Sequence, residues 1–158
     1  MRMRILVGGA VAALSVAAMV VTLAAQADPF VGTWKTNVAK SKYSPGPAPK
    51  SATLVITAEA GGYKQVTDTV PATGAATHAE VSWKFDGKDN PVKGNPSVDT
   101  TSYAKTDAHT YTATSKKGGK VVVTSKIVIS ADGKTRTTTQ TGTTTDGKPL
   151  NNTIVAEK

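Results

Sequence analysis

Glycine turns punctuate the sequence between residues 60 and 150, and their spacing restricts the fold more than any other feature. The dipeptides are Gly61-Gly62, Asp86-Gly87, Gly118-Gly119, Asp132-Gly133 and Asp146-Gly147. Such pairs tolerate the positive φ angles that tight hairpin turns require. The segments between them are short and rich in threonine, which favours strands over helices. The pattern therefore predicts a series of antiparallel hairpins.

No segment shows sustained helical periodicity, so the whole domain is expected to consist of strands and turns. We expect strands at Gly32–Thr36, Ala52–Ala58, Tyr63–Val70, Thr77–Phe85, Val98–Lys105, His109–Ser115, Lys120–Ser130, Lys134–Thr143 and Leu150–Ala156. Their short connections leave little room for crossovers, which favours an antiparallel meander. A long meander removes its open edges by closing. The predicted fold class is all-β, an up-and-down barrel of about eight or nine strands, with a two-layer β-sandwich as the alternative.

The first 27 residues differ in composition from the rest. Arg2 and Arg4 precede an uncharged apolar run, which ends in Ala25-Gln26-Ala27. These features predict a signal peptide over residues 1–27 and a secreted or periplasmic protein. The apolar run, at about 20 residues, could alternatively remain as an N-terminal anchor. If the run is cleaved, we expect no stable membrane insertion of the mature protein. Residues 28–158 are long enough for a single domain with its own core.

Charge and cysteine content exclude several classes of function. The formal net charge of +8 falls to +6 without the two leader arginines, and Arg136 is the only other arginine. Lysines dispersed along the chain favour solubility and weak attraction to anionic polymers, whereas nucleic-acid recognition relies on arginine, so no nucleic-acid partner is expected. The chain contains no cysteine, which excludes thiolate nucleophiles and zinc–thiolate sites.

Alternation along the strands predicts which side chains face inward. Val81, Trp83 and Phe85 share one face of their strand, opposite His78 and Glu80. Roughly half of the strands contribute mainly Thr, Ser, Ala or Gln to the interior, so the barrel either is flattened or keeps a cavity of mixed polarity. In the second case a small hydrophobic or amphipathic ligand would contact Val81, Trp83, Phe85 and Tyr111. Ordinary core packing of the same residues is the alternative.

Gly32-Thr33-Trp34, followed by a long first loop and a train of short strands, resembles the start of the lipocalin-like (calycin-type) barrels. The resemblance implies structural roles for Gly32 and Trp34, with the indole closing one end of the barrel. It also implies a basic residue over that indole, for which Arg136 is a candidate. The first loop, with its proline-rich Ser44–Pro49, would lie over the open end or act as a rigid connector. The strings "DPFVGTWKTNVAKSKYSPGPAPKS" and "FDGKDNPVKGNP" are also similar to a group of uncharacterised secreted bacterial proteins.

Catalytic motifs are sparse. His78 and His109 are the only histidines, neither has a local metal-ligand spacing, and no Gly-x-Ser-x-Gly occurs. We therefore expect no catalytic residues, no metal and no cofactor. The predicted function is that of an exported, monomeric, non-catalytic barrel that binds or carries a small hydrophobic or amphipathic ligand. The alternative is an envelope or matrix protein that acts through its lysine- and threonine-rich surface without a ligand cavity.

Overall fold

The computed structural model describes residues 28–158, so the predicted signal peptide lies outside the described residues. Within this range there are ten strands and one short 3-10 helix. The elements are β1 (Gly32–Thr36), η1 (Val38–Lys40), β2 (Ser51–Glu59), β3 (Gly62–Val70), β4 (Thr77–Trp83), β5 (Asn90–Pro91), β6 (Thr100–Lys105), β7 (Thr110–Lys117), β8 (Lys120–Ile129), β9 (Thr135–Thr143) and β10 (Pro149–Glu157). Each predicted strand is present, with its ends within two residues of the expected positions. The two-residue β5 and the three-residue 3-10 helix η1 were not predicted.

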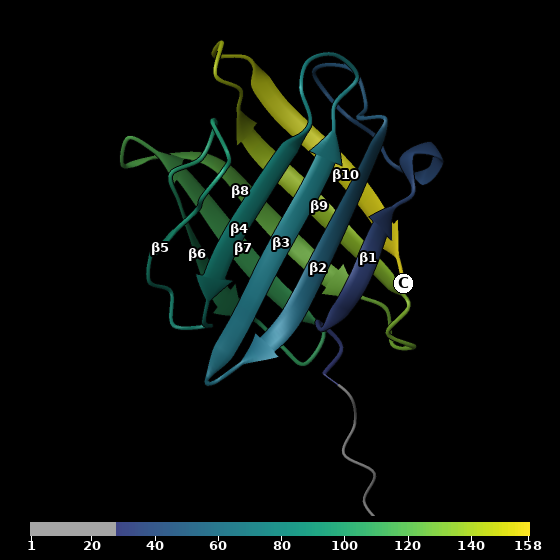
Figure 1. The fold of residues 1–158 in the computed structure, drawn as a ribbon, viewed down its shortest axis with the longest axis vertical. Coiled ribbons are helices and arrows are strands. Elements are labelled where there is room, and N and C mark those ends of the chain that lie inside the picture. The colour runs from purple at the N-terminus through teal and green to yellow at the C-terminus, as the bar shows by residue number, and fades with distance from the viewer. Residues whose placement is uncertain (1–27) are drawn as a thin grey trace, which may run out of the picture.

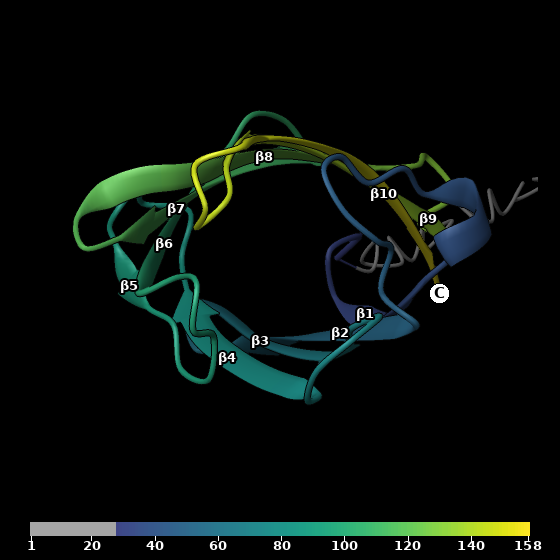
Figure 2. The same ribbon diagram turned by 90° about the horizontal axis from the view of Figure 1, so that it is seen from above.

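The strands form one antiparallel sheet that curls into a nearly closed up-and-down barrel (Figures 1 and 2). Their order is β4-β3-β2-β1-β10-β9-β8-β7-β6-β5, so each strand except at the β1–β10 junction pairs with its neighbour in sequence. Pairing of β1 with β10 joins the first and last strands of the described domain. The predicted fold class is therefore confirmed, and the barrel rather than the sandwich alternative is found.

One seam completes the ring, between β4 and the short β5–β6 side. It consists of a single bridge in which Glu80 and Lys93 exchange two backbone hydrogen bonds of 2.9 Å. Gly94 follows the bridge with a φ of +76°, and a Cβ at this position would collide with the carbonyl oxygen of His78. A glycine is therefore required for the backbone of this loop to approach β4 so closely.

The first loop forms part of the barrel wall. β1 pairs with β10 only through Lys35 and Thr36, and the chain then continues alongside β10. Lys42 exchanges backbone hydrogen bonds of 2.7 and 2.9 Å with Thr153, and Ser44 accepts one of 2.6 Å from Asn151. The loop thus fills the gap between β10 and β2 that the short first strand leaves.

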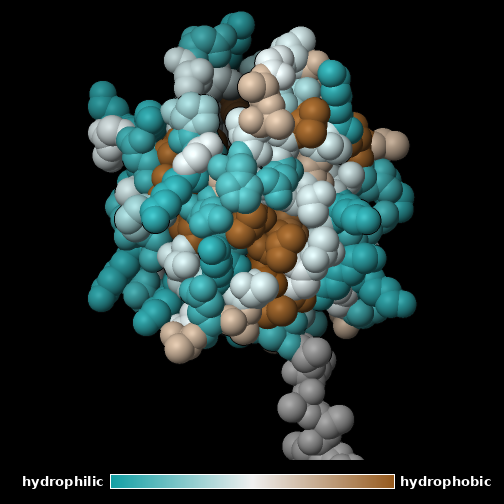
Figure 3. Space-filling view, viewed as in Figure 1, coloured by the Kyte–Doolittle hydropathy of each residue, from teal (hydrophilic) through white to brown (hydrophobic). Residues whose placement is uncertain are grey.

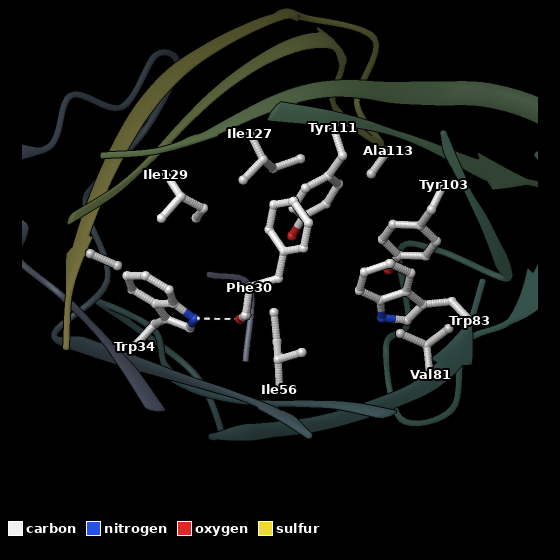
Figure 4. Packing of buried hydrophobic residues seen from close by; sticks show 11 residues of the cluster. Phe30, Trp34, Ile56, Val81, Trp83, Tyr103, Tyr111, Ala113, Ile127 and Ile129 are labelled. Carbon is white, nitrogen blue, oxygen red and sulfur yellow. Dashed lines mark hydrogen bonds between the residues drawn. The ribbon is translucent and has the colours of Figure 1, made fainter. Parts of the chain in front are cut away.

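The two ends of the barrel differ in chemistry. We call the end with the β2–β3 turn (60–61) and the β8–β9 turn (130–134) the lower end, and the end with the β3–β4 turn (71–76) and the β9–β10 turn (144–148) the upper end, as they stand in Figure 1. Most of the large buried side chains lie on the strand segments nearer the lower end, and Figure 4 shows how they pack against one another. They are Phe30, Trp34, Ile56, Trp83, Tyr103, Tyr111, Ile127 and Ile129.

Candidate functional site

The four residues predicted to contact a ligand lie together in the interior. Val81 and Trp83 come from β4, Phe85 follows the end of that strand, and Tyr111 comes from the opposite wall on β7. The ring of Trp83 lies 5.0 Å from that of Phe85 and 5.6 Å from that of Tyr111, between centroids. These side chains therefore fill the lower interior by packing against one another, and any ligand would have to lie above them.

The aromatic cluster includes three further rings. Trp83 is stacked between Tyr63 at 4.5 Å and Tyr103 at 4.2 Å, so both faces of its indole are covered. Phe30 packs edge-on against Tyr111 at 5.1 Å. Sequence reasoning did not identify Phe30, although counting back in steps of two from Trp34 through Gly32 places it on the same inward face.

The segment before β1 closes the lower end. Phe30 is 1% exposed, and its carbonyl oxygen accepts a hydrogen bond of 3.1 Å from the indole N–H of Trp34, which is completely buried (Figure 4). Asp28 accepts a bond of 2.6 Å from the hydroxyl of Tyr63. Burial and this bond to the carboxylate raise the pKa of Tyr63 to about 12. Together these contacts fasten the start of the domain across the lower end.

The basic residue over Trp34 is Lys158, not the Arg136 that the resemblance suggested. Its ammonium lies 4.4 Å from the centre of the indole ring and donates a hydrogen bond to the carbonyl of Pro29. Gly32 has a φ of +142°, and a Cβ there would lie 2.8 Å from Cε of Lys158. The Gly-x-Trp motif therefore leaves space for a lysine that covers the tryptophan.

The upper interior is lined by neutral polar side chains. Residues paired across antiparallel strands lie on the same face of the sheet. Gln65 pairs with the buried Ile56 and Val81, and Gln140 pairs with Ser125 and Asn152. The inward polar positions obtained in this way are Gln65, Thr67, Thr69, Thr101, Ser115, Ser125, Gln140 and Asn152.

These side chains bond to one another and remain partly accessible to solvent. The amide of Asn152 donates to Gln140 at 3.0 Å, and Thr101 and Ser115 share a hydroxyl bond of 3.0 Å. Most of the set, including Gln65 and Gln140, is only half-buried although it faces inward. These inward-facing polar side chains are therefore not sealed from solvent, unlike the aromatic cluster below them.

A small pocket lies at the rim of the upper end. It has a volume of about 290 Å³ and lies between the proline-rich first loop and the β3–β4 turn. Its lining residues are Tyr43, Pro47, Pro49, Thr69, Pro71, Ala72 and Thr73. Thr69 belongs to the inward-facing set, so the rim pocket adjoins the upper interior. The surface is hollowed near this end in the space-filling view (Figure 3).

Three buried side-chain nitrogens have no hydrogen-bond partner among residues 28–158; Nδ1 of His109 lies in the turn before β7, and the other two are donors inside the barrel. One is the indole N–H of Trp83, a side chain that is 2% exposed, and the other is Nε–H of Arg136. In Figure 4 the indole nitrogen of Trp83 lies on the side of the ring that faces Ile56, directed into the barrel. Unpaired buried donors are rare in proteins and costly, so each is a candidate contact for a bound molecule.

The histidines and carboxylates are the remaining side chains that could ligate a metal. Residues 28–158 contain no group of three or more His, Cys, Asp or Glu side chains placed to hold a metal ion. His78 and Glu80 face outward, as alternation predicted, and His78 contacts Asp68 at 2.6 Å and Glu80 at 3.2 Å. These two carboxylates raise the pKa of His78.

Comparisons with protein-family models, with curated proteins and with solved structures found no match. The nearly closed antiparallel barrel is compatible with a lipocalin-like fold. In the part of the chain that the structure describes, no helix is long and apolar enough to cross a membrane.

Proposed function

We propose that the protein is an exported, non-catalytic barrel that binds or carries a small amphipathic molecule in the upper half of its interior. The molecule would rest on Val81 and the edge of Trp83 and contact the polar walls above them. Phe85 and Tyr111 would complete this floor, because both pack on Trp83. Access would be through the upper end, beside the rim pocket.

The observation that carries the proposal is the unpaired indole N–H of Trp83. Leaving a buried donor without a partner costs about 1–3 kcal/mol. A purely apolar side chain would fill the core at this position without an unpaired donor. A ligand with an acceptor atom would satisfy the indole N–H of Trp83. A ligand would approach that donor past the half-buried polar side chains above it.

A titration with the neutral fluorescent probe N-phenyl-1-naphthylamine tests this function. We expect saturable binding at one site. Thr67→Phe places a ring in the upper interior and should abolish probe binding, whereas Val66→Phe, on the opposite face of the same strand, should not. Non-saturable probe binding, or equal binding by both variants, would refute a site for an amphipathic ligand in the barrel.

Export follows from the predicted leader and is part of the proposal. A mass spectrum of protein recovered from outside the cytoplasm should show a chain that begins at Asp28. A chain that retains Met1 would instead support the anchor alternative.

A surface function is the second candidate, and one observation favours it: the aromatic rings already fill the lower interior. The outer face in Figure 3 is mainly hydrophilic, with a small apolar patch over β2 and β3. In that case the protein should co-sediment with anionic envelope polymers, and this binding should decrease as salt screens its lysines.

A further inference from the structure

Arg136 is an interior cation without an acidic partner. It lies on the inward face of β9, paired with the buried Ile129 and with Ala156 on the neighbouring strands. Its Nη1 donates to the hydroxyl of Thr138 at 2.8 Å, and its Nη2 donates to the hydroxyl of Tyr111 at 3.2 Å. No carboxylate forms a salt bridge with it among residues 28–158.

The guanidinium lies at the boundary between the two halves of the interior. Thr138, which it bonds, is the next inward residue above it on β9, and Gln140 of the polar set follows two residues later. Tyr111, its other partner, belongs to the aromatic floor. The positive charge is therefore placed where the floor meets the polar walls.

Donors exceed acceptors at this boundary. Nε–H of Arg136 and the indole N–H of Trp83 have no acceptor among the described residues. Tyr111 accepts the bond from Arg136, so its own hydroxyl proton is free to be donated outward. Arg136 is half-buried, with its Nε fully covered, and charges removed from water in proteins are normally paired because desolvation of an unpaired ion is expensive. Three donors and one positive charge together favour an anionic oxygen ligand.

We propose that the interior binds a small carboxylic acid whose remaining part carries hydroxyl or amide groups. This inference rests on the proposed function and specifies the ligand class. The carboxylate would accept bonds from Arg136 and Tyr111, with Trp83 as a further donor. The rest of the molecule would extend upward between Gln65, Thr67, Gln140, Ser125 and Asn152, whose neutral donors and acceptors match hydroxyl and amide groups rather than an alkyl chain.

Three six-carbon probes test the carboxylate and the hydroxyl groups of the proposed ligand separately. Their binding is measured by isothermal titration calorimetry on the chain that begins at Asp28. Gluconate has both the carboxylate and the hydroxyl groups, sorbitol lacks the carboxylate, and hexanoate lacks the hydroxyl groups. We expect gluconate to bind at one site, and sorbitol and hexanoate to bind at least about tenfold more weakly. Sorbitol binding as tightly as gluconate would overturn the carboxylate site, and hexanoate doing so would overturn the hydroxylated ligand class.

Variants of the cationic side test the named residues. Arg136→Gln should weaken gluconate binding about 10- to 100-fold, since a hydrogen bond to a charged group is lost together with the charge. Arg136→Lys keeps the charge but lacks the planar guanidinium group. Its affinity for gluconate should lie between that of the unaltered protein and that of Arg136→Gln. Thr137→Val, on the outward face beside it, is the matched control and should bind gluconate normally.

Folding of each variant is checked by its far-ultraviolet circular dichroism and its thermal midpoint. If Arg136→Gln does not fold, Tyr111→Phe removes a single hydroxyl and should still weaken gluconate binding several-fold. Unchanged gluconate affinity in the folded variants would overturn the assignment. If the naphthylamine probe binds but gluconate does not, the ligand class is wrong and the barrel function stands. If neither binds, both fail.

Discussion

Phe30→Ala should strongly destabilise the domain, because this buried ring packs against three other aromatic rings at the lower end of the barrel. The ring is 1% exposed and packs edge-on against Tyr111 at 5.1 Å, Phe85 at 5.5 Å and Tyr63 at 6.4 Å. Truncation of a buried phenylalanine to alanine typically costs about 3–5 kcal/mol, through lost burial and the cavity left behind. That is a large share of the stability of a typical domain, about 5–15 kcal/mol.

The assay is equilibrium urea unfolding of the chain from Asp28, followed by tryptophan fluorescence. We expect the free energy of unfolding to fall by about 3 kcal/mol or more, with an unchanged dependence on urea concentration. Val121→Ala, at a side chain that is 56% exposed, is the matched control and should change it by less than about 0.5 kcal/mol. The backbone carbonyl that accepts the bond from Trp34 remains in the variant. A loss below about 1 kcal/mol for Phe30→Ala would refute the reasoning that this segment closes the barrel.

Three further predictions concern the lower end and the seam. Gly32→Ala should lower the free energy of unfolding by about 1–3 kcal/mol, because its φ of +142° suits glycine and the new methyl group would meet Lys158; an unchanged urea midpoint would contradict this. The pKa of Tyr63 rises from 10 when unfolded to about 12 when folded, so the folded state holds this proton more tightly. Stability from this tyrosine is therefore fully present below pH 10 and lost as pH rises towards 12, and urea midpoints at several alkaline pH values should fall less steeply in Tyr63→Phe. Gly94→Ala should speed amide hydrogen exchange at Glu80 and Lys93 by separating the seam, while exchange in β8 and β9 stays unchanged.

Strand positions were predictable because each depends on local sequence. Gly61-Gly62 and Gly118-Gly119 provide the positive φ angles that their hairpin turns use, with 75° at Gly61 and 56° at Gly118. Alternation correctly placed Val81 and Trp83 inward and His78 and Glu80 outward. β5 could not be predicted in this way, because two residues around Pro91 have no periodicity and pair with β6 only through the folded loop.

The contents of the interior depend on contacts between distant segments, which local patterns do not record. Lys158 and Trp34 meet only because β1 and β10 are neighbours in the closed sheet. The same applies to Arg136 and Tyr111, which come from strands separated by β8. Composition did indicate an interior of mixed polarity, but not that aromatic residues would gather at one end and polar residues at the other. The ligand-contacting roles of Val81, Trp83, Phe85 and Tyr111 stay a prediction.

The seam between β4 and β5 has a mechanical consequence. β3 and β4 are joined along seven residue pairs, whereas the backbone of β4 is joined to that of the β5–β6 side by the two hydrogen bonds of the Glu80–Lys93 bridge. Under load, the molecule should therefore respond as a rolled sheet with one weak edge contact rather than as a uniformly bonded cylinder. A force that separates Glu80 from Lys93 would break two backbone hydrogen bonds and the stacking of Trp83 on Tyr103, while the same force applied across β3 and β4 would have to break a whole ladder. The resistance of this barrel to stretching should thus depend strongly on the direction of pull.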